Sequence, residues 1–135
     1  MLRKGSAILV YHSFDETARV FSTSPINFRQ QVETIRCERI PVVPLRQIRQ
    51  TNGAICLTFD DGFRNFTEHA LPVLLEYQIP ATLFVVSGYC GKSRGWASIS
   101  PPSALDDELL SWTEVREYVQ GNWQSDSAQT GRKDS

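Results

Sequence analysis

The sequence predicts an α/β fold with parallel strands, and three features support this prediction. Short apolar runs alternate along the chain with longer segments of helical periodicity. Each apolar run is continuous rather than alternating, as in strands that are buried on both faces of a sheet. The resulting order is strand, helix, strand, helix, strand, helix. This alternation is typical of a parallel sheet, because parallel neighbours must be joined by a crossover connection.

Length and charge limit the classes of protein to which the chain can belong. It has 135 residues, which suits one domain, and 14 Lys and Arg against 15 Asp and Glu give a net charge of −1. This balance offers no excess of cations for phosphate groups, so we expect no nucleic-acid partner. The apolar runs are too short for a membrane span or a signal peptide. As written, the chain is therefore expected to be cytoplasmic.

The first predicted strand and helix lie in the N-terminal half of the chain. The strand covers residues 7–11 and ends at His12. Ser24 and Pro25 open a segment with helical spacing, and proline is favoured at the first helical position, so we predict a helix over residues 26–40. Before Gly53 we expect only a short extended piece and at most two turns of helix.

The second predicted strand covers residues 54–59 and ends at the acidic pair Asp60 and Asp61, followed by Gly62. A helical stripe of apolar residues follows over residues 68–77. Pro72 should lie near the start of this helix, because proline interrupts the hydrogen bonds of a helix interior.

A third strand is predicted over residues 81–86 and a last helix over residues 112–119. From residue 121 onward the sequence has one apolar anchor, Trp123, and no periodicity. Such composition predicts a disordered tail over residues 121–135.

The residues most suited to chemistry are the adjacent acids Asp60 and Asp61. Parallel α/β sheets bind ligands at the carboxyl ends of their strands, where this pair lies. Gly62 permits the positive φ that would turn both carboxylates toward one pocket. One acid could then bind a metal while the other acts as a base toward water. A helix cap or an Asx turn would use the same residue types, and these alone favour neither interpretation.

Two histidines differ in position. His12 ends the first strand as Asp60 ends the second, so parallel neighbours would place both at one edge of the sheet. By residue type alone, His12 more often would be a loop histidine bonded to the backbone. His69 lies within the predicted second helix, and we expect it at the surface.

The stretch over residues 55–88 resembles the opening of the polysaccharide deacetylases, the family with the NodB homology domain. The resemblance rests on the ordered segments Tyr11-His12-Ser13-Phe14, Thr58-Phe59-Asp60-Asp61-Gly62, Leu71-Pro72, Pro80-Ala81-Thr82 and Leu110-Ser111-Trp112. It implies a partial NodB-like domain over residues 1–120, followed by a tail over 121–135 outside the family pattern. The implied fold is an incomplete (β/α) barrel of the polysaccharide deacetylase type, since a complete barrel takes about 250 residues.

The resemblance also implies an activity, the metal-dependent hydrolysis of N-acetyl or O-acetyl groups on an acetylated polysaccharide or oligosaccharide. By position, Asp60 would be the catalytic base, Asp61 a ligand of a divalent metal, usually zinc, and His12 would lie near the substrate. Members of the family are often exported.

The sequence departs from the family after the helix that begins at Trp112, because the two histidines that complete the family's metal site are absent. The implied zinc site is therefore incomplete, with Asp61 as its one ligand present. We expect the truncated N-terminal half of a deacetylase, without useful activity by itself.

The sequence also suggests one alternative function, disfavours another and predicts self-association. A non-catalytic carbohydrate-binding relic of the same fold is the alternative. An aspartate-nucleophile phosphatase is disfavoured, because its two acids are separated by one residue whereas Asp60 and Asp61 are adjacent. An open sheet edge, where the next barrel strand would pair, predicts self-association.

Overall fold

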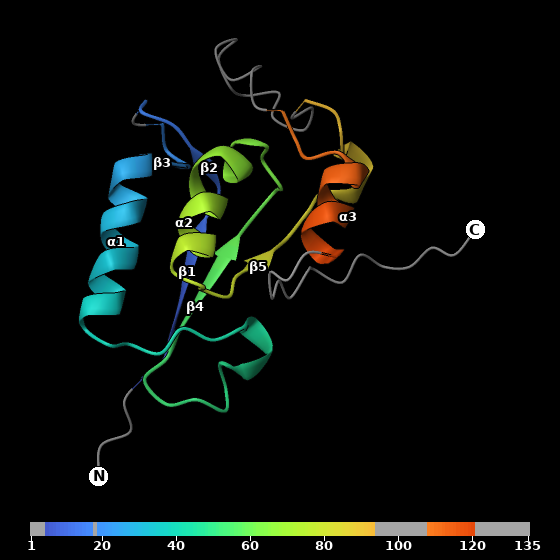
Figure 1. Ribbon diagram of the computed structural model, residues 1–135. Coiled ribbons are helices and arrows are strands. Elements are labelled where there is room, and N and C mark those ends of the chain that lie inside the picture. Colours follow the sequence, from blue (N-terminus) through green and yellow to red (C-terminus); the bar gives the residue numbers. More distant parts are fainter. Residues whose placement is uncertain (1–4, 18, 94–107, 121–135) are drawn as a thin grey trace.

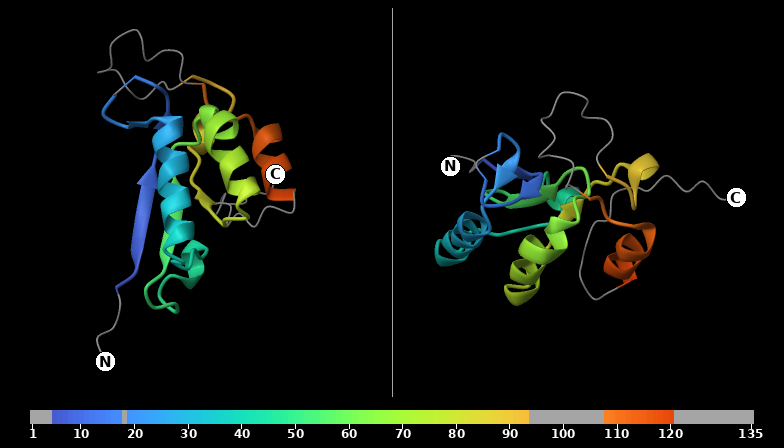
Figure 2. Two further views of the ribbon diagram at one scale, coloured as in Figure 1. Left: turned by 60° about the vertical axis from the view of Figure 1, so that its left-hand side comes forward. Right: turned by 90° about the horizontal axis from the view of Figure 1, so that it is seen from above.

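The computed structural model describes residues 5–17, 19–93 and 108–120, which form a parallel sheet with helices packed on one of its faces (Figure 1). The three-stranded sheet has the order β1-β4-β5, and both neighbouring pairs are parallel. In the right-hand view of Figure 2, helices α1, α2 and α3 lie on the same side of this sheet. The predicted α/β class with parallel strands is confirmed.

The register of the sheet brings its strand ends level. Strand β1 (Ala7–Tyr11) pairs with β4 (Ile55–Phe59) along its whole length, with Tyr11 opposite Phe59. The ladder continues one step further, because the Asp60 amide donates to the Tyr11 carbonyl at 2.8 Å. The residues that follow Tyr11 and Phe59 therefore emerge at the same edge of the sheet.

Helix α1 (Pro25–Cys37) begins as predicted and ends earlier than predicted. The Ser24 hydroxyl caps it by accepting a hydrogen bond from the Asn27 amide at 3.2 Å. The helix was expected to reach residue 40, but Arg39 has a left-handed φ of 54°. The Ile40 amide then donates to the Ile35 carbonyl at 3.1 Å, which closes the helix end. Because no glycine occupies this position, the sequence carries no stop signal there.

The second helical segment also differs from the prediction over residues 68–77. It starts with a π-helical turn, η2 (Phe66–Ala70), and continues as α2 (Leu71–Glu76). The Leu71 amide donates to the Phe66 carbonyl in the wide π spacing. The next residue is Pro72, which has no amide hydrogen to donate to a helical carbonyl. An irregular turn at this place therefore loses few backbone hydrogen bonds.

The third strand is shorter than predicted. Strand β5 covers Thr82–Leu83, preceded by a single bridge residue at Ala81, although the sequence predicted a strand over residues 81–86. The Phe84 amide still donates to the Phe59 carbonyl at 2.8 Å. Beyond that point β4 has ended, so residues 84–86 have no partner on that strand and lead into a 3-10 turn, η3 (Ser87–Tyr89).

Helix α3 (Trp112–Gln120) begins where the sequence predicted. The Ser111 hydroxyl accepts from the Glu114 amide at 3.2 Å, and the Glu114 carboxylate accepts from the Ser111 amide at 2.8 Å. This reciprocal arrangement is a capping box, which satisfies two amides that a helix start leaves unpaired.

Three short elements were not predicted as such. Strands β2 (Ser13–Phe14) and β3 (Ser22–Thr23) form a separate two-stranded parallel sheet, and η1 (Leu45–Gln47) is a single 3-10 turn. Strands of two residues show no periodicity that a sequence pattern can reveal. The predicted tail over residues 121–135 lies outside the described residues.

The core between sheet and helices is dominated by aromatic rings. Phe14, Phe28, Phe59 and Phe66 are almost fully buried and pack with Tyr11. The Tyr11 ring contacts that of Phe28 edge-on, with centroids 5.0 Å apart, and that of Phe59 in a stacked arrangement at 5.4 Å. Burial raises the pKa of the Tyr11 hydroxyl to about 12, and this hydroxyl donates to Gln31 Oε1 at 2.6 Å.

The opposite face of the sheet is more open. Ile8 and Val10 on β1 are exposed, whereas Tyr11 from the same strand points into the core, so the prediction of a strand buried on both faces is wrong for β1. Strands β1 and β5 are the edges of the described sheet, since each pairs with β4. Self-association through such an edge remains a prediction. Within the described ranges, no helix is long and apolar enough to span a membrane.

Asn65, at the start of η2, links the helical layer to β2. Its side-chain amide donates to Ser13 Oγ and to the Phe14 carbonyl, both at 2.9 Å, and its Oδ1 accepts from the Phe14 amide at 3.2 Å. One half-buried side chain thus satisfies both backbone groups of Phe14 and fixes the segment that directly follows His12.

We predict that Asn65→Ala lowers the free energy of unfolding by about 2 kcal/mol, because partly buried backbone groups lose their partners. Thr34→Ala is the matched control, since the exposed Thr34 hydroxyl donates to the Gln30 carbonyl within helix α1 at 2.8 Å. We expect a loss below about 1 kcal/mol for the control. Urea unfolding followed by circular dichroism measures both, and equal losses would contradict the linking role of Asn65.

Candidate functional site

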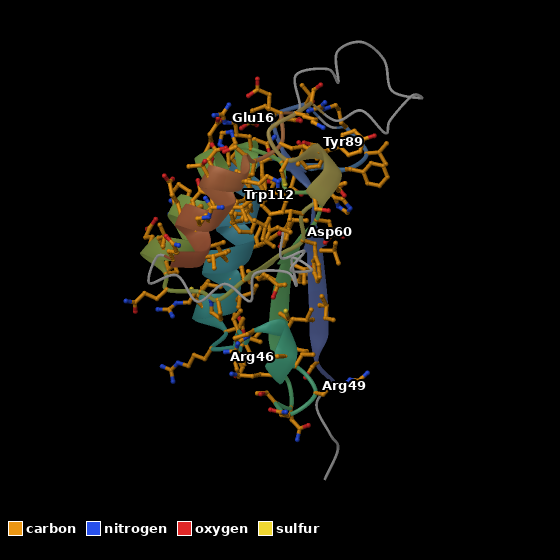
Figure 3. All side chains as sticks on the ribbon, turned by 90° about the vertical axis from the view of Figure 1, so that its right-hand side faces the viewer. Glu16, Arg46, Arg49, Asp60, Tyr89 and Trp112 are labelled. Carbon is orange, nitrogen blue, oxygen red and sulfur yellow. The ribbon has the colours of Figure 1, made fainter. Side chains whose placement is uncertain are left out.

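Three sequence-predicted residues lie at the carboxyl ends of neighbouring strands. Asp60 and Asp61 directly follow β4, and His12 directly follows β1. Figure 3 shows Asp60 toward the end of the sheet that carries Glu16 and Tyr89, away from Arg46 and Arg49. This is the edge at which parallel α/β sheets hold their ligands.

The turn after β4 has an uncommon backbone conformation. Asp61 has a φ of 72° and Gly62 a φ of 71°, so two successive residues are left-handed. Aspartate tolerates this region better than most residues, and glycine adopts it without steric cost. A Cβ atom at Gly62 would also lie 3.0 Å from Val85 Cγ1. The turn is therefore packed tightly against the segment after β5, which brings the two acids beside that segment.

Asp60 and His12 face each other across the edge of the sheet. His12 Nε2 lies 3.8 Å from Asp60 Oδ2, and both side chains are partly exposed. Partial burial raises the pKa of the Asp60 carboxyl; the charge of His12 opposes this shift and that of Asp61 adds to it. Asp60 is consequently a stronger base than a fully solvated aspartate.

A pocket of about 310 Å³ lies beside the acids. Its lining comes from the end of β4 and the segment after β5, namely Asp60, Asp61, Phe84, Val85 and Val86. Two carboxylates thus border one side and an apolar wall the other. A small group with a hydrogen-bond donor at one end and an apolar group at the other, such as a secondary amide with a methyl group, matches this lining.

The structure brings the three predicted residues close together, although they do not all line the same pocket. His12 is within ion-pair distance of Asp60, and Asp61 shares the pocket with Asp60, whereas His12 is not part of its lining. The helix-cap interpretation of the acids is wrong, because η2 begins only at Phe66. His69 is half-exposed on η2, with its Nε2 3.9 Å from Glu68 Oε2.

Sequence reasoning missed the apolar wall of the pocket. Phe84, Val85 and Val86 were assigned to the third strand, yet they follow it and line the site. The end of β4 at Phe59 could have indicated this, because a neighbouring strand that stops there leaves residues 84–86 without a pairing partner. Asn65 was missed because its contacts join segments that are far apart in sequence.

The described residues do not form a metal site of the zinc type. Within residues 5–17, 19–93 and 108–120, no group of three His, Cys, Asp or Glu side chains could hold a metal ion. A catalytic zinc normally takes three protein ligands and a water. Asp61 alone does not fit such a centre, and the residues placed for chemistry at this edge are Asp60 and His12.

A larger open groove of about 640 Å³ lies away from the acids, beside the start of α3. Three of its charged side chains pair with one another: Arg64 Nη1 lies 2.6 Å from Glu108 Oε2, and Arg64 Nε lies 3.2 Å from Glu114 Oε1. We regard the smaller pocket as the candidate site, because it contains the two strand-end carboxylates.

Comparison with known proteins gives consistent relatives. The family model described as polysaccharide deacetylase matches residues 47–127. The poly-β-1,6-N-acetyl-D-glucosamine N-deacetylase of Staphylococcus aureus (strain MSSA476) is 22% identical over 124 residues, which cover 86% of this chain and 40% of the relative. The enzyme of the same name from Escherichia coli (strain K12) is 25% identical over 127 residues, covering 85% of this chain and 19% of the relative.

Solved structures show the same fold. IcaB from Ammonifex degensii superposes with a TM-score of 0.76 at 23% identity, covering 92% of this chain and 52% of that one. A de-N-acetylase from Aggregatibacter actinomycetemcomitans gives a TM-score of 0.72 at 22% identity, covering 91% of this chain and 53% of that one. The chain thus spans about half of these structures. The expected barrel type, present in part, is confirmed.

Three observations agree: the strand order of the sheet, the acidic pair at the end of β4, and a family model that matches more than half of the chain. This protein belongs to the polysaccharide deacetylase family.

Proposed function

We propose that this chain carries the Asp60 side of the active site of a carbohydrate N-deacetylase, a hydrolase that cleaves the amide bond of an N-acetylated sugar polymer. The observation that supports this most is the pocket in which Asp60 and Asp61 face an apolar wall. The relatives named above suggest a poly-N-acetylglucosamine substrate. The proposal concerns a domain over residues 1–120.

In the proposed reaction, Asp60 removes a proton from water, and the oxygen of that water attacks the acetyl carbonyl carbon. The carbon–nitrogen bond then breaks, the proton held by Asp60 passes to the leaving nitrogen, and a free amine and acetic acid leave, the acid ionising to acetate at neutral pH. The raised pKa of Asp60 favours this role, because a more basic carboxylate takes a proton more readily. His12, 3.8 Å from Asp60, would orient that carboxylate and contact the sugar. The wall of Phe84, Val85 and Val86 would receive the acetyl methyl group.

We propose a divalent metal, zinc by family resemblance, only for a complete enzyme of this family. Asp61 would be one ligand of such a metal, and the described residues bring no two further ligands to it. We therefore expect the 135-residue chain to be far slower than an ordinary enzyme, below about 1 turnover per second.

Acetate release tests the role of Asp60. The purified chain is incubated with zinc, cobalt or nickel and a β-1,6-linked N-acetylglucosamine tetramer, beside Asp60→Asn and the control Glu33→Gln on α1. We expect any release by the wild type to fall at least about 100-fold in Asp60→Asn and to stay unchanged in the control. Release that survives Asp60→Asn would contradict the base role. Tight binding without any release would favour the non-catalytic, carbohydrate-binding alternative.

Ligand choice tests the pocket. We expect the N-acetylglucosamine tetramer to bind with a Kd about tenfold lower than that of a β-1,6-linked glucose tetramer. The two ligands differ only at the acetamido group, whose methyl would contact the wall of Phe84, Val85 and Val86. Isothermal titration calorimetry measures both affinities. Equal affinities would show that the pocket does not receive the acetyl group.

The raised pKa of Asp60 also predicts a pH effect on stability. Below the unfolded-state pKa of about 3.9 the carboxyl is protonated in both states, and its favourable contribution is fully present. That contribution is lost as the pH rises through the higher pKa of the folded state. We therefore expect Asp60→Asn to gain stability relative to wild type between pH 3 and pH 7, measured by urea unfolding. A constant difference across this range would disprove the shift.

A further inference from the structure

An exposed aromatic ring lies just beyond the acids. The rings of Phe21 and His12 are in contact, with centroids 5.4 Å apart and planes tilted by 46°. His12 in turn lies 3.8 Å from Asp60. Phe21, His12 and Asp60 therefore follow one another along the edge of the sheet, and the pocket with the apolar wall begins at Asp60.

Phe21 is unusually open to solvent for a residue of its size. It is 64% exposed, whereas four other phenylalanines, Phe14, Phe28, Phe59 and Phe66, are at most 1% exposed. Large aromatic side chains are mostly buried in folded proteins. One exposed ring needs no explanation by itself, but this ring contacts His12, which lies within ion-pair distance of a carboxylate that lines the pocket.

The backbone that carries Phe21 is held in place. The Phe21 carbonyl accepts from the Ser13 amide at 3.1 Å, and the Thr23 carbonyl accepts from the Asp15 amide at 3.2 Å. Ser13 is in turn bonded to Asn65, as described above. The ring is therefore presented by a short sheet that is anchored to the helical layer.

Asp15 stabilises the same loop through hydrogen bonds and an ion pair. Its carboxylate accepts from the amide and the hydroxyl of Thr17, at 2.8 and 2.6 Å, and pairs with Arg19. Burial alone would raise the pKa of Asp15, but the hydrogen bonds from Thr17, Arg19 and Ser22 together with the charge of Arg19 lower it to about 2. The Asp15 carboxyl is thus ionised at neutral pH. A surface that is ordered before binding loses less conformational entropy when a ligand arrives.

We propose that Phe21 is a stacking platform for a sugar ring of the polymer, one position along the chain from the residue whose acetyl group enters the pocket. This inference rests on the proposed function. A pyranose ring has a face of C–H groups and a rim of hydroxyls. The ring of Phe21 offers a polar-free π face to the former, while the neighbouring carboxylate of Asp60 accepts hydrogen bonds from the latter.

A sugar ring explains this arrangement better than a lipid surface. The exposed apolar pair Val20 and Phe21, at 91% and 64% exposure, could also enter a membrane. However, the Phe21 ring is in contact with His12, and the acids beyond His12 would be repelled by anionic headgroups. A stacking platform should also bind any sugar ring, whether or not it is acetylated.

The test compares the wild type and three variants on two ligands. The β-1,6-linked tetramers of N-acetylglucosamine and of glucose are titrated by calorimetry into the wild type, Phe21→Ala, Phe21→Trp and Val20→Ala. We expect Phe21→Ala to raise the Kd about tenfold for both tetramers by the same factor, leaving their ratio unchanged. Phe21→Trp should retain affinity, because it keeps an aromatic face, and Val20→Ala should match the wild type.

Each other outcome overturns the inference in a recognisable way. Unchanged binding by Phe21→Ala, with the preference for the acetylated tetramer intact, refutes the platform and leaves the proposed function standing. Absence of binding of either tetramer to the wild type refutes both. Sedimentation with vesicles of phosphatidylcholine and phosphatidylglycerol is measured in parallel. If Phe21→Ala abolishes only vesicle binding, Phe21 is a membrane contact and the platform is refuted.

Discussion

The parallel ladder between β1 and β4 is the constraint on which the rest of this structure depends. The two strands pair over five residues without slippage, and one further hydrogen bond joins Asp60 to Tyr11. Since side chains alternate along a strand, a shift of one residue would turn the inward ring of Phe59 away from the helices. The same shift would separate His12 from Asp60. Core packing and the geometry of the site are thus set by one register.

The aromatic core holds this register in place. Rings from β1, β2, α1, β4 and η2 meet in a single cluster, with Tyr11 and Phe59 stacked directly on the neighbouring strands. Phe66 contacts Phe59 edge-on at 4.9 Å and joins η2 to the sheet. Because these rings are large and rigid, moving one strand end would disturb several contacts at once. The residues of the site lie at the edge of this rigid body.

Local backbone strain is concentrated where the site is built. Asp61 is a non-glycine residue in the left-handed region, and Gly62 follows with the same sign of φ. Such a conformation persists only when its surroundings support it, here the close contact of the turn with Val85. Arg39 and Gln78 also have positive φ, but each ends a helix and lies away from the acids. Strain at Asp61 instead places two carboxylates beside an apolar wall.

Sequence patterns were sufficient for the fold class, the order of the main strands and helices, and the acids Asp60 and Asp61, because these depend on local periodicity and on residues adjacent in the chain. The family resemblance could be recognised for the same reason. Helix ends at Arg39 and Gln78, the short length of β5 and the wall of Phe84, Val85 and Val86 could not be predicted, since each depends on where a partner segment stops. The contacts of Asn65 with Phe14 and of Phe21 with His12 were likewise decided only by the tertiary structure. They join residues through packing and hydrogen bonds that no local sequence pattern records.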